Sequence, residues 1–183
     1  MKKYPLILLI LLFGITLIGL NSCNDDNCSL TTTSAATFDL LSSNSHSSIA
    51  LTEAVTITAS TTADVIVRDT LPDGSVVDKV VKDSILNDTI YNAEKKLSKL
   101  KIPLSYSTKT TITIQYTELL KDEIEIKHRP IPFVSDINCG VLMFYQIEDI
   151  KYTTNALDSI TIANPKVTNE ETVNFNMYYT IAE

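Results

Sequence analysis

Cysteine thiols and histidine imidazoles are the side chains of this sequence that can take part in the most kinds of catalytic chemistry. The chain has three cysteines, Cys23, Cys28 and Cys139, and two histidines. A thiol within hydrogen-bond reach of His128, with a third group orienting the imidazole, would form a nucleophile, and Cys139 is close to His128 in sequence. However, His128 ends a strand-like segment just before Pro130, where we expect a partly buried structural histidine. A hydrolase using the loops around His128 to Cys139 is therefore the enzymatic alternative and not the favoured interpretation.

Acidic residues form the second candidate group, because Asp122, Glu123 and Glu125 lie close together. A pair of carboxylates at a suitable separation can hydrolyse glycosides. This cluster follows a segment with the character of a turn between two strands, so we expect a solvated tip instead. After the N-terminal segment the glycines are Gly74 and Gly140, and neither opens a phosphate-binding loop. Cys-x-x-Cys and His-x-x-x-His spacings are also absent, so the sequence predicts no catalytic site, no metal and no cofactor.

The N-terminus has the composition of a secretory signal. Lys2 and Lys3 precede an apolar segment from Leu6 to Leu20, and the chain becomes polar after Cys23. The apolar segment is at the upper limit of a signal-peptide core and shorter than the roughly 20 residues that span a bilayer. We therefore expect residues 1–22 to be a cleaved signal, with a short uncleaved anchor as the alternative.

Residues Leu20, Asn21, Ser22 and Cys23 resemble the lipobox of bacterial lipoproteins, with an aliphatic residue three positions before the cysteine and a small residue just before it. The resemblance implies that the Cys23 thiol receives a diacylglycerol and that the new amino terminus is acylated, for instance with palmitate. Several acyl chains, each contributing roughly 0.8 kcal/mol per buried methylene, form a stable anchor. The expected protein is a lipoprotein of the cell envelope, anchored to the outer membrane.

Residues 23–34 are expected to form a polar tether. Asp25 and Asp26 resemble the acid-rich export signal of surface lipoproteins in the Bacteroidota, which implies display on the outer face of the outer membrane. An ordinary solvated linker has the same composition and would suit a domain in the periplasm. Both the periplasmic and the surface-exposed location therefore stay open.

The charge of the chain limits its partners. The formal net charge is −7, and loss of the two positive charges of Lys2 and Lys3 with the signal brings it to −9. Nucleic acids and anionic lipid surfaces attract basic proteins, so neither is an expected partner. The expected partners are the membrane, through the N-terminal lipid, and another envelope or surface protein.

Cys28 and Cys139 are left once Cys23 is assigned to the lipid. Export places them in a compartment that permits disulfides, where two cysteines most simply form one bridge. A bridge that closes a loop of about 100 residues contributes up to roughly 4.7 kcal/mol in the chain-entropy model. This bridge would also fasten the tether to the domain. A nucleophilic thiol and a metal site are the competing interpretations.

Hydrophobic periodicity favours strands throughout residues 35–183, a length sufficient for one domain. In Val173–Ile181 apolar and polar residues alternate strictly, as in a strand with one buried face. Further strands are expected at Thr37–Leu41, Val55–Ala59, Asp64–Arg68, Ser75–Val81, Ile112–Tyr116, Ile124–Lys127, Val141–Ile147 and Ser159–Ala163. Many short strands without amphipathic helices predict an all-β chain, folded as an antiparallel β-sandwich of immunoglobulin-like or related type.

Two segments between these strands carry their own signals. In Leu71-Pro72-Asp73-Gly74 the proline presets one corner and Asp-Gly tolerates a positive φ, so a hairpin is expected there. Asn92–Lys101 has leucines at helical spacing with lysines between them, and it is compatible with a helix or with a charged loop.

Short motifs occur in the part of the chain from about Asn87 onward. They are Asp88–Asn92, Ile102–Leu104, Pro132–Ser135 before Cys139-Gly140, and Asn164–Pro165. Together they resemble a family of uncharacterised Bacteroidota lipoproteins classed as a domain of unknown function. Members share the lipobox, a cysteine just beyond it and a Cys-Gly in the β-rich part, so the resemblance is consistent with pairing of Cys28 and Cys139. It implies no catalytic residue, because the family has no assigned activity.

By elimination, these observations favour a non-catalytic binding or assembly module over an enzyme. A β-sandwich presents loops at its ends and can pair an exposed edge strand with a partner. The chain has no tryptophan to stack on sugars, which disfavours glycan binding. The expected function is that of an accessory protein that docks another envelope protein, and a purely structural envelope protein is an alternative beside the hydrolase.

Overall fold

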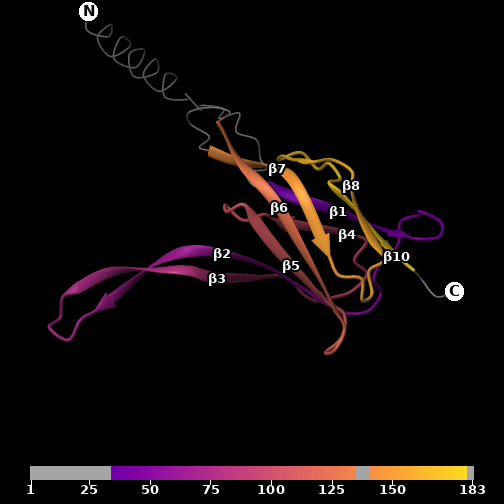
Figure 1. The fold of residues 1–183 in the computed structure, drawn as a ribbon. Helices are drawn as coiled ribbons and strands as arrows, with labels where there is room; N and C mark the ends of the chain where they lie inside the picture. The colour runs from indigo at the N-terminus through magenta and orange to yellow at the C-terminus, as the bar shows by residue number, and fades with distance from the viewer. Residues whose placement is uncertain (1–33, 135–140, 181–183) are drawn as a thin grey trace, which may run out of the picture.

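The computed structural model describes residues 34–134 and 141–180, and every regular element in these ranges is a β-strand. Figure 1 shows two layers of strands from which one long hairpin extends. The strands are β1 (Ala35–Ser42), β2 (Val55–Thr70), β3 (Val76–Glu94), β4 (Lys99–Pro103), β5 (Lys109–Gln115), β6 (Lys121–Val134), β7 (Val141–Tyr152), β8 (Ser159–Ile162), β9 (Lys166–Val167) and β10 (Phe175–Tyr179). The predicted all-β sandwich is confirmed.

The two layers are a four-stranded sheet in the order β4-β1-β10-β8 and a six-stranded sheet in the order β3-β2-β5-β6-β7-β9. Neighbouring strands are antiparallel except β1 and β10, which pair in parallel. The parallel pair joins the first and last described strands, and its partners Phe38 and Phe175 stack with ring centroids 4.5 Å apart. Local sequence gives no signal for this pairing, because the two strands are separated by most of the chain.

The core lies between the two sheets and follows the alternation seen in the sequence. Phe175, Met177 and Tyr179 of β10 face it, while Asn176 and Tyr178 between them are more exposed. β10 therefore confirms the strand predicted at Val173–Ile181, with shorter bounds. The largest fully buried side chains are Phe38, Phe175, Leu40, Ile57, Leu100, Ile102, Ile112, Ile114, Ile124, Ile126, Leu157 and Met177. Burial of each such side chain contributes roughly 1.5–3 kcal/mol.

β2 is one continuous strand, although its sequence suggested two strands, Val55–Ala59 and Asp64–Arg68. β5 pairs with β2 only from Thr56 to Ser60, whereas β3 pairs with β2 along its whole length. Beyond Ser60 the two strands therefore continue as a two-stranded ribbon that leaves the sandwich (Figure 1). We call residues 61–86, with the turn they enclose, the arm.

The tip of the arm is the predicted hairpin turn, which is confirmed. The Leu71 N–H donates to the Ser75 carbonyl, and the Gly74 N–H donates to the Leu71 carbonyl, at 2.8 and 2.9 Å. Gly74 has a φ of 82°, in the left-handed region that costs glycine little. A type I turn followed by a left-handed glycine is a common three-residue hairpin loop, and Pro72 fits its first corner.

β6 continues through Pro130 and Pro132 to Val134, so the prediction that this strand ends at His128 is wrong. The N–H of His128 points toward β5, where it donates to the Thr108 carbonyl at 2.9 Å. The nitrogens of Pro130 and Pro132 lie on the same edge because the backbone alternates, and β5 no longer pairs with β6 there. The two prolines thus remove no hydrogen bond from the sheet.

The segment Asn92–Lys101, expected as a helix or a charged loop, contains the end of β3 and the start of β4. Between them Leu97 forms an isolated bridge with Leu51. Leu100 is fully buried in β4. Leu97 and Leu100, although they are at helical spacing, therefore lie in extended backbone and make separate contacts.

Candidate functional site

The three cysteines that carry the sequence predictions lie outside the described residues. This applies to the lipid attachment at Cys23 and to the disulfide between Cys28 and Cys139. Both stay predictions. Peptide mapping without reductant tests the disulfide, and recovery of Cys28 and Cys139 as free thiols would contradict it.

His128 lies in the interior of the sandwich and is fully buried. Its Nε2 atom is 2.9 Å from Oγ1 of Thr110, and its ring meets the Tyr145 ring edge-on, with centroids 5.3 Å apart. Burial lowers the pKa of His128 to about 4, against a smaller opposite effect of the Glu148 charge, so the imidazole is neutral at pH 7. Nδ1 has no hydrogen-bond partner among the described residues. This part of the chain therefore supplies no carboxylate to orient the imidazole as a catalytic base would require.

A chain of hydroxyl groups leads from His128 to the surface at the base of the arm. The buried Thr110 hydroxyl donates to Oγ of Ser105 at 3.2 Å. Ser105 Oγ is 2.9 Å from Ser107 Oγ, which is 2.7 Å from Thr61 Oγ1. Sequence reasoning missed this network, since its members come from three separate segments of the chain.

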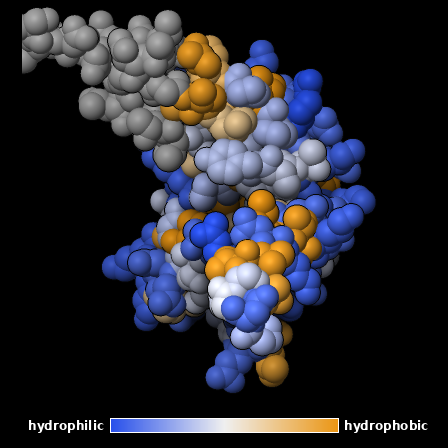
Figure 2. Space-filling model, turned by 90° about the vertical axis from the view of Figure 1, so that its left-hand side faces the viewer, coloured by the Kyte–Doolittle hydropathy of each residue, from blue (hydrophilic) through white to orange (hydrophobic). Residues whose placement is uncertain are grey.

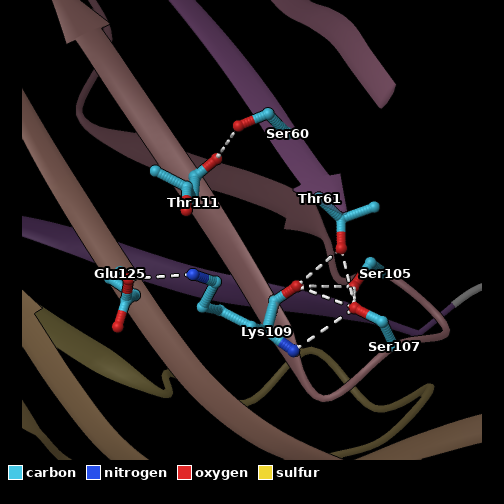
Figure 3. Close-up of polar contacts among 7 residues, drawn as sticks. All are labelled: Ser60, Thr61, Ser105, Ser107, Lys109, Thr111 and Glu125. Carbon is cyan, nitrogen blue, oxygen red and sulfur yellow. Dashed lines mark hydrogen bonds and ion pairs between the residues drawn. The ribbon is translucent and has the colours of Figure 1, made fainter. Parts of the chain in front are cut away.

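Figure 3 shows that the surface end of the network is gathered around one backbone carbonyl. The Lys109 carbonyl accepts hydrogen bonds from Thr61, Ser105 and Ser107 at 2.8, 2.9 and 3.0 Å. The Lys109 ammonium points the other way and pairs with Glu125 at 3.2 Å. Because the hydroxyls satisfy each other and a carbonyl, the network fastens the β4–β5 loop to β2 and leaves no activated nucleophile.

A cleft of about 210 Å³ opens at the junction between the arm and the sandwich. It is lined by Ala59, Ser60, Thr61, Leu86, Asn87, Asp88, Ile90, Pro103, Leu104, Ser105 and Thr110. The cleft is smaller than the roughly 300–1,000 Å³ of sites for drug-sized ligands. Its size and its mixture of aliphatic walls and hydroxyls suit a single side chain of a protein partner better than a small-molecule substrate.

Asp122 contradicts the prediction of a solvated acidic tip, because its side chain is fully buried. The carboxylate accepts hydrogen bonds from the Thr153 hydroxyl and from the backbone N–H groups of Asn155, Ala156 and Leu157, at 2.7–2.9 Å. Burial alone would raise the pKa of Asp122, but these four hydrogen bonds together outweigh it and lower the pKa. The Asp122 carboxylate thus holds the loop after β7 in place through these hydrogen bonds.

A signal for the burial of Asp122 was present in the sequence. Asp122 has the same parity in β6 as Ile124 and Ile126, which face the core. Glu123 and Glu125 have the opposite parity and pair with surface lysines, as expected for solvated acids. Alternation therefore separates one buried carboxylate from two exposed ones, and it argues against a catalytic pair.

The arm is the largest feature that the sequence did not predict. It exposes apolar side chains on both of its faces. Residues opposite one another in an antiparallel pair share a face, so Ile66 and Val80 lie on one face and Val65 and Val81 on the other. Ile66 is 68% exposed and Val80 is 54% exposed. The exposed apolar residues of the arm are Ile66, Val67, Leu71, Val76, Val77, Val80, Val81, Ile85 and Leu86. Figure 2 looks at the arm from its tip and shows hydrophobic side chains among hydrophilic ones.

Residues 34–134 and 141–180 contain no group of three or more His, Cys, Asp or Glu side chains placed to hold a metal ion. None of them forms a helix with the length and hydropathy needed to span a bilayer.

Comparison with known proteins places the chain in a family. Residues 77–179 match a family described as a family of unknown function (DUF6452). The match covers more than half of the chain, so the chain belongs to this family. It begins within β3 and ends with β10, which leaves β1 and β2 outside it. No curated protein and no solved structure matches the chain.

Proposed function

We propose that the chain is a lipid-anchored protein of the cell envelope whose sandwich is a non-catalytic module that docks a partner protein through the arm. The observation that carries this proposal is the arm itself, a ribbon with apolar side chains exposed on both faces. Contiguous exposed apolar surface on a soluble domain marks interaction sites. A two-stranded ribbon without a packing layer is also only marginally stable in water, so a partner would complete it.

The backbone of the arm favours a protein as the occupant. Among the described strands, β3 is the edge strand of its sheet, and β2 beyond Ser60 has β3 as its only neighbour. Both edges of the arm therefore offer unpaired N–H and C=O groups, which another chain can satisfy by adding a strand. A small molecule would leave most of these groups in water.

The charges of the arm indicate what kind of protein fits. Residues 61–86 contain five aspartates and three basic residues, all exposed, and the whole chain is acidic as well. A second copy of the chain would bring like charges together, whereas a groove with apolar walls and a basic rim complements the arm. We therefore expect a different protein with such a groove, whose side chain can also enter the cleft at the base of the arm.

Photo-cross-linking in living cells tests the arm. A photo-reactive phenylalanine analogue replaces Ile66, and the matched control carries it at Leu119, a 97% exposed residue in the β5–β6 turn. We expect a cross-linked partner at position 66 only. The identified partner, once purified, should bind the wild-type protein at least tenfold more tightly than Ile66→Asp or Val80→Asp, while Leu119→Asp should bind like wild type.

Two results would contradict the docking proposal. Equal cross-linking at positions 66 and 119 would show that the arm is not a preferred surface. A product composed of two copies of this chain would replace the heterologous partner with a homodimer.

The anchor has its own test. Cys23→Ala should abolish incorporation of labelled palmitate and release the protein from the membrane fraction, whereas Cys28→Ala should do neither. An unlabelled wild-type protein would contradict the lipid anchor. Treatment of intact cells with a non-penetrating protease then separates the two locations, because cleavage indicates surface display and protection indicates the periplasm.

A further inference from the structure

The cleft at the base of the arm continues one face of the arm. Thr61 and Leu86, the first and last residues of the arm, both line the cleft and lie opposite one another in β2 and β3. Ala59 and Asp88 form another opposite pair, two residues farther toward the sandwich. Because opposite residues share a face and the period of a strand is two, these four side chains lie on the same face. A partner bound along this face of the arm therefore reaches the cleft.

The cleft lies where the edges of the two sheets approach each other. Among the described strands, β3 is the edge of the six-stranded sheet and β4 is an edge of the four-stranded sheet. The Tyr91 hydroxyl of β3 accepts a hydrogen bond from the Lys101 N–H of β4 at 3.0 Å, which joins the two edges. Nearer the arm the edges are separated, and the cleft lies between Leu86–Ile90 of β3 and Pro103–Ser105 at the end of β4.

Aliphatic side chains supply the apolar walls of the cleft. They are Ala59, Leu86, Ile90, Pro103 and Leu104. Leu86 is 47% exposed and Ile90 is half-buried, so part of this apolar surface is in contact with water. Walls of this kind suit the methylene groups of a long side chain, which gain from leaving water while a polar end stays outside.

The hydroxyl groups of the lining already have partners. The Ser60 hydroxyl donates to a backbone carbonyl of β5, and the Thr61 and Ser105 hydroxyls donate to the Lys109 carbonyl (Figure 3). The buried Thr110 hydroxyl donates to Ser105. Their donors are used within the protein, so an anionic ligand would find no free hydroxyl donor here.

Asp88 is the charged residue among the described residues that line the cleft. Its carboxylate is exposed, and no described residue forms a hydrogen bond or an ion pair with it. The lysines that border the lining segments are paired elsewhere, Lys101 with Glu171 and Lys109 with Glu125. A negative charge without a described partner therefore lies beside aliphatic walls.

We infer that the cleft binds an arginine or lysine side chain of the partner, with its methylene groups against the aliphatic walls and its cationic end on the Asp88 carboxylate. This inference rests on the proposed docking function of the arm, and it adds the anchor residue of the partner. A strand added to the edge of β3 directs every second side chain to the face that Leu86 and Asp88 share. A basic residue at that position gains both a charge-assisted hydrogen bond and apolar contact.

Selection of displayed peptides tests the cleft. A phage library of random twelve-residue peptides is depleted on Asp88→Arg, whose reversed charge repels a cationic side chain, and then selected on the full-length wild-type protein. We expect the retained peptides to share an arginine or lysine beside apolar residues. A synthetic peptide of this kind should bind at least tenfold more tightly than its analogue with norleucine at the basic position, because norleucine keeps the methylene groups and lacks the charge.

Matched variants locate the binding at Asp88. The same peptide should bind Asp88→Asn at least tenfold more weakly than wild type, and it should bind Asp88→Glu within about threefold of wild type. Asp69→Asn removes another exposed aspartate, on the arm and away from the cleft, and should bind like wild type. Both aspartates are exposed, so equal melting temperatures of the variants should show that they are folded.

Three results would each overturn the inference. They are the retention of no peptide after the depletion, retained peptides without a basic residue, and equal binding to wild type and Asp88→Asn. None of them affects cross-linking at position 66, so the docking function of the arm is judged separately. Binding that depends on Asp88 without a cross-linked partner at position 66 would keep the basic-residue site and remove the arm as its docking surface.

Discussion

The sandwich half and the arm half of β2 belong to one continuous strand and have different surroundings. In the sandwich half Val55, Ile57 and Ala59 are buried beneath the four-stranded sheet. Farther along the same strand Val65 is partly exposed, and Ile66 and Val67 are 68% and 45% exposed. The difference is the second layer, which covers the first half and does not extend to the arm.

This comparison shows that an apolar side chain in a strand is buried only where a second layer of the structure covers its face. In the sandwich half each large side chain is removed from water, with a gain of roughly 1.5–3 kcal/mol. In the arm the cross-strand pairs contribute only roughly 0.2–1 kcal/mol each. We therefore expect substitutions in the sandwich to change stability and substitutions in the arm to change binding.

The largest contrast is expected between two isoleucines of β2. Ile57→Ala should lower the free energy of unfolding by about 2–5 kcal/mol, because it leaves a cavity in the core. Ile66→Ala should change it by less than about 0.5 kcal/mol, since the side chain is already exposed. Urea denaturation followed by circular dichroism measures both values. A large loss for Ile66→Ala would show that the isolated protein already packs the arm.

Asp122→Asn should lower the free energy of unfolding by about 3 kcal/mol, because an amide cannot accept all four hydrogen bonds that the buried carboxylate receives. The lowered pKa of Asp122 sets the sign of the pH effect. Its contribution is complete above the unfolded-state value of about 3.9 and is lost as the pH falls toward the lower folded-state value. Denaturation of Glu123→Gln, an exposed neighbour, is the control and should match wild type.

The lowered pKa of His128 leads us to expect a further loss of stability in acid. The folded-state pKa is about 4, below the unfolded value of about 6.5, so the unfolded chain binds more protons between these values. The contribution of His128 to the free energy of unfolding should therefore be fully present above about pH 6.5, and it should decrease by about 2–3 kcal/mol as the pH falls to 4. Urea denaturation across this range should give a flatter profile for His128→Gln. An unchanged slope would mean that His128 does not titrate on unfolding.

The smallest effect is expected at the arm turn. Gly74→Val should destabilise the turn by about 1–2 kcal/mol, because φ is 82° although no atom lies near the added Cβ. Since the arm carries no core, this strain should increase hydrogen exchange at Val76–Val81 without lowering the melting temperature of the sandwich. A clear fall in that temperature would indicate that the arm and the sandwich unfold as one unit.

The sequence alone determined the features that depend on neighbouring residues. Alternation in β10 and β5 predicted their strands, and Leu71-Pro72-Asp73-Gly74 predicted the hairpin, because side-chain period and turn geometry are local properties. The N-terminal motif likewise determined the expectation of a lipid on Cys23, which lies outside the described residues. The structure therefore leaves that expectation untested.

The tertiary structure alone decided which apolar and polar groups are covered. It paired β1 with β10 in parallel, buried Asp122 and His128, and left the arm outside the two-layered sandwich. Each outcome depends on contacts between segments that are far apart in the chain. The periodicity of one strand contains no information about where the opposite sheet ends, so it cannot distinguish a core strand from an exposed ribbon.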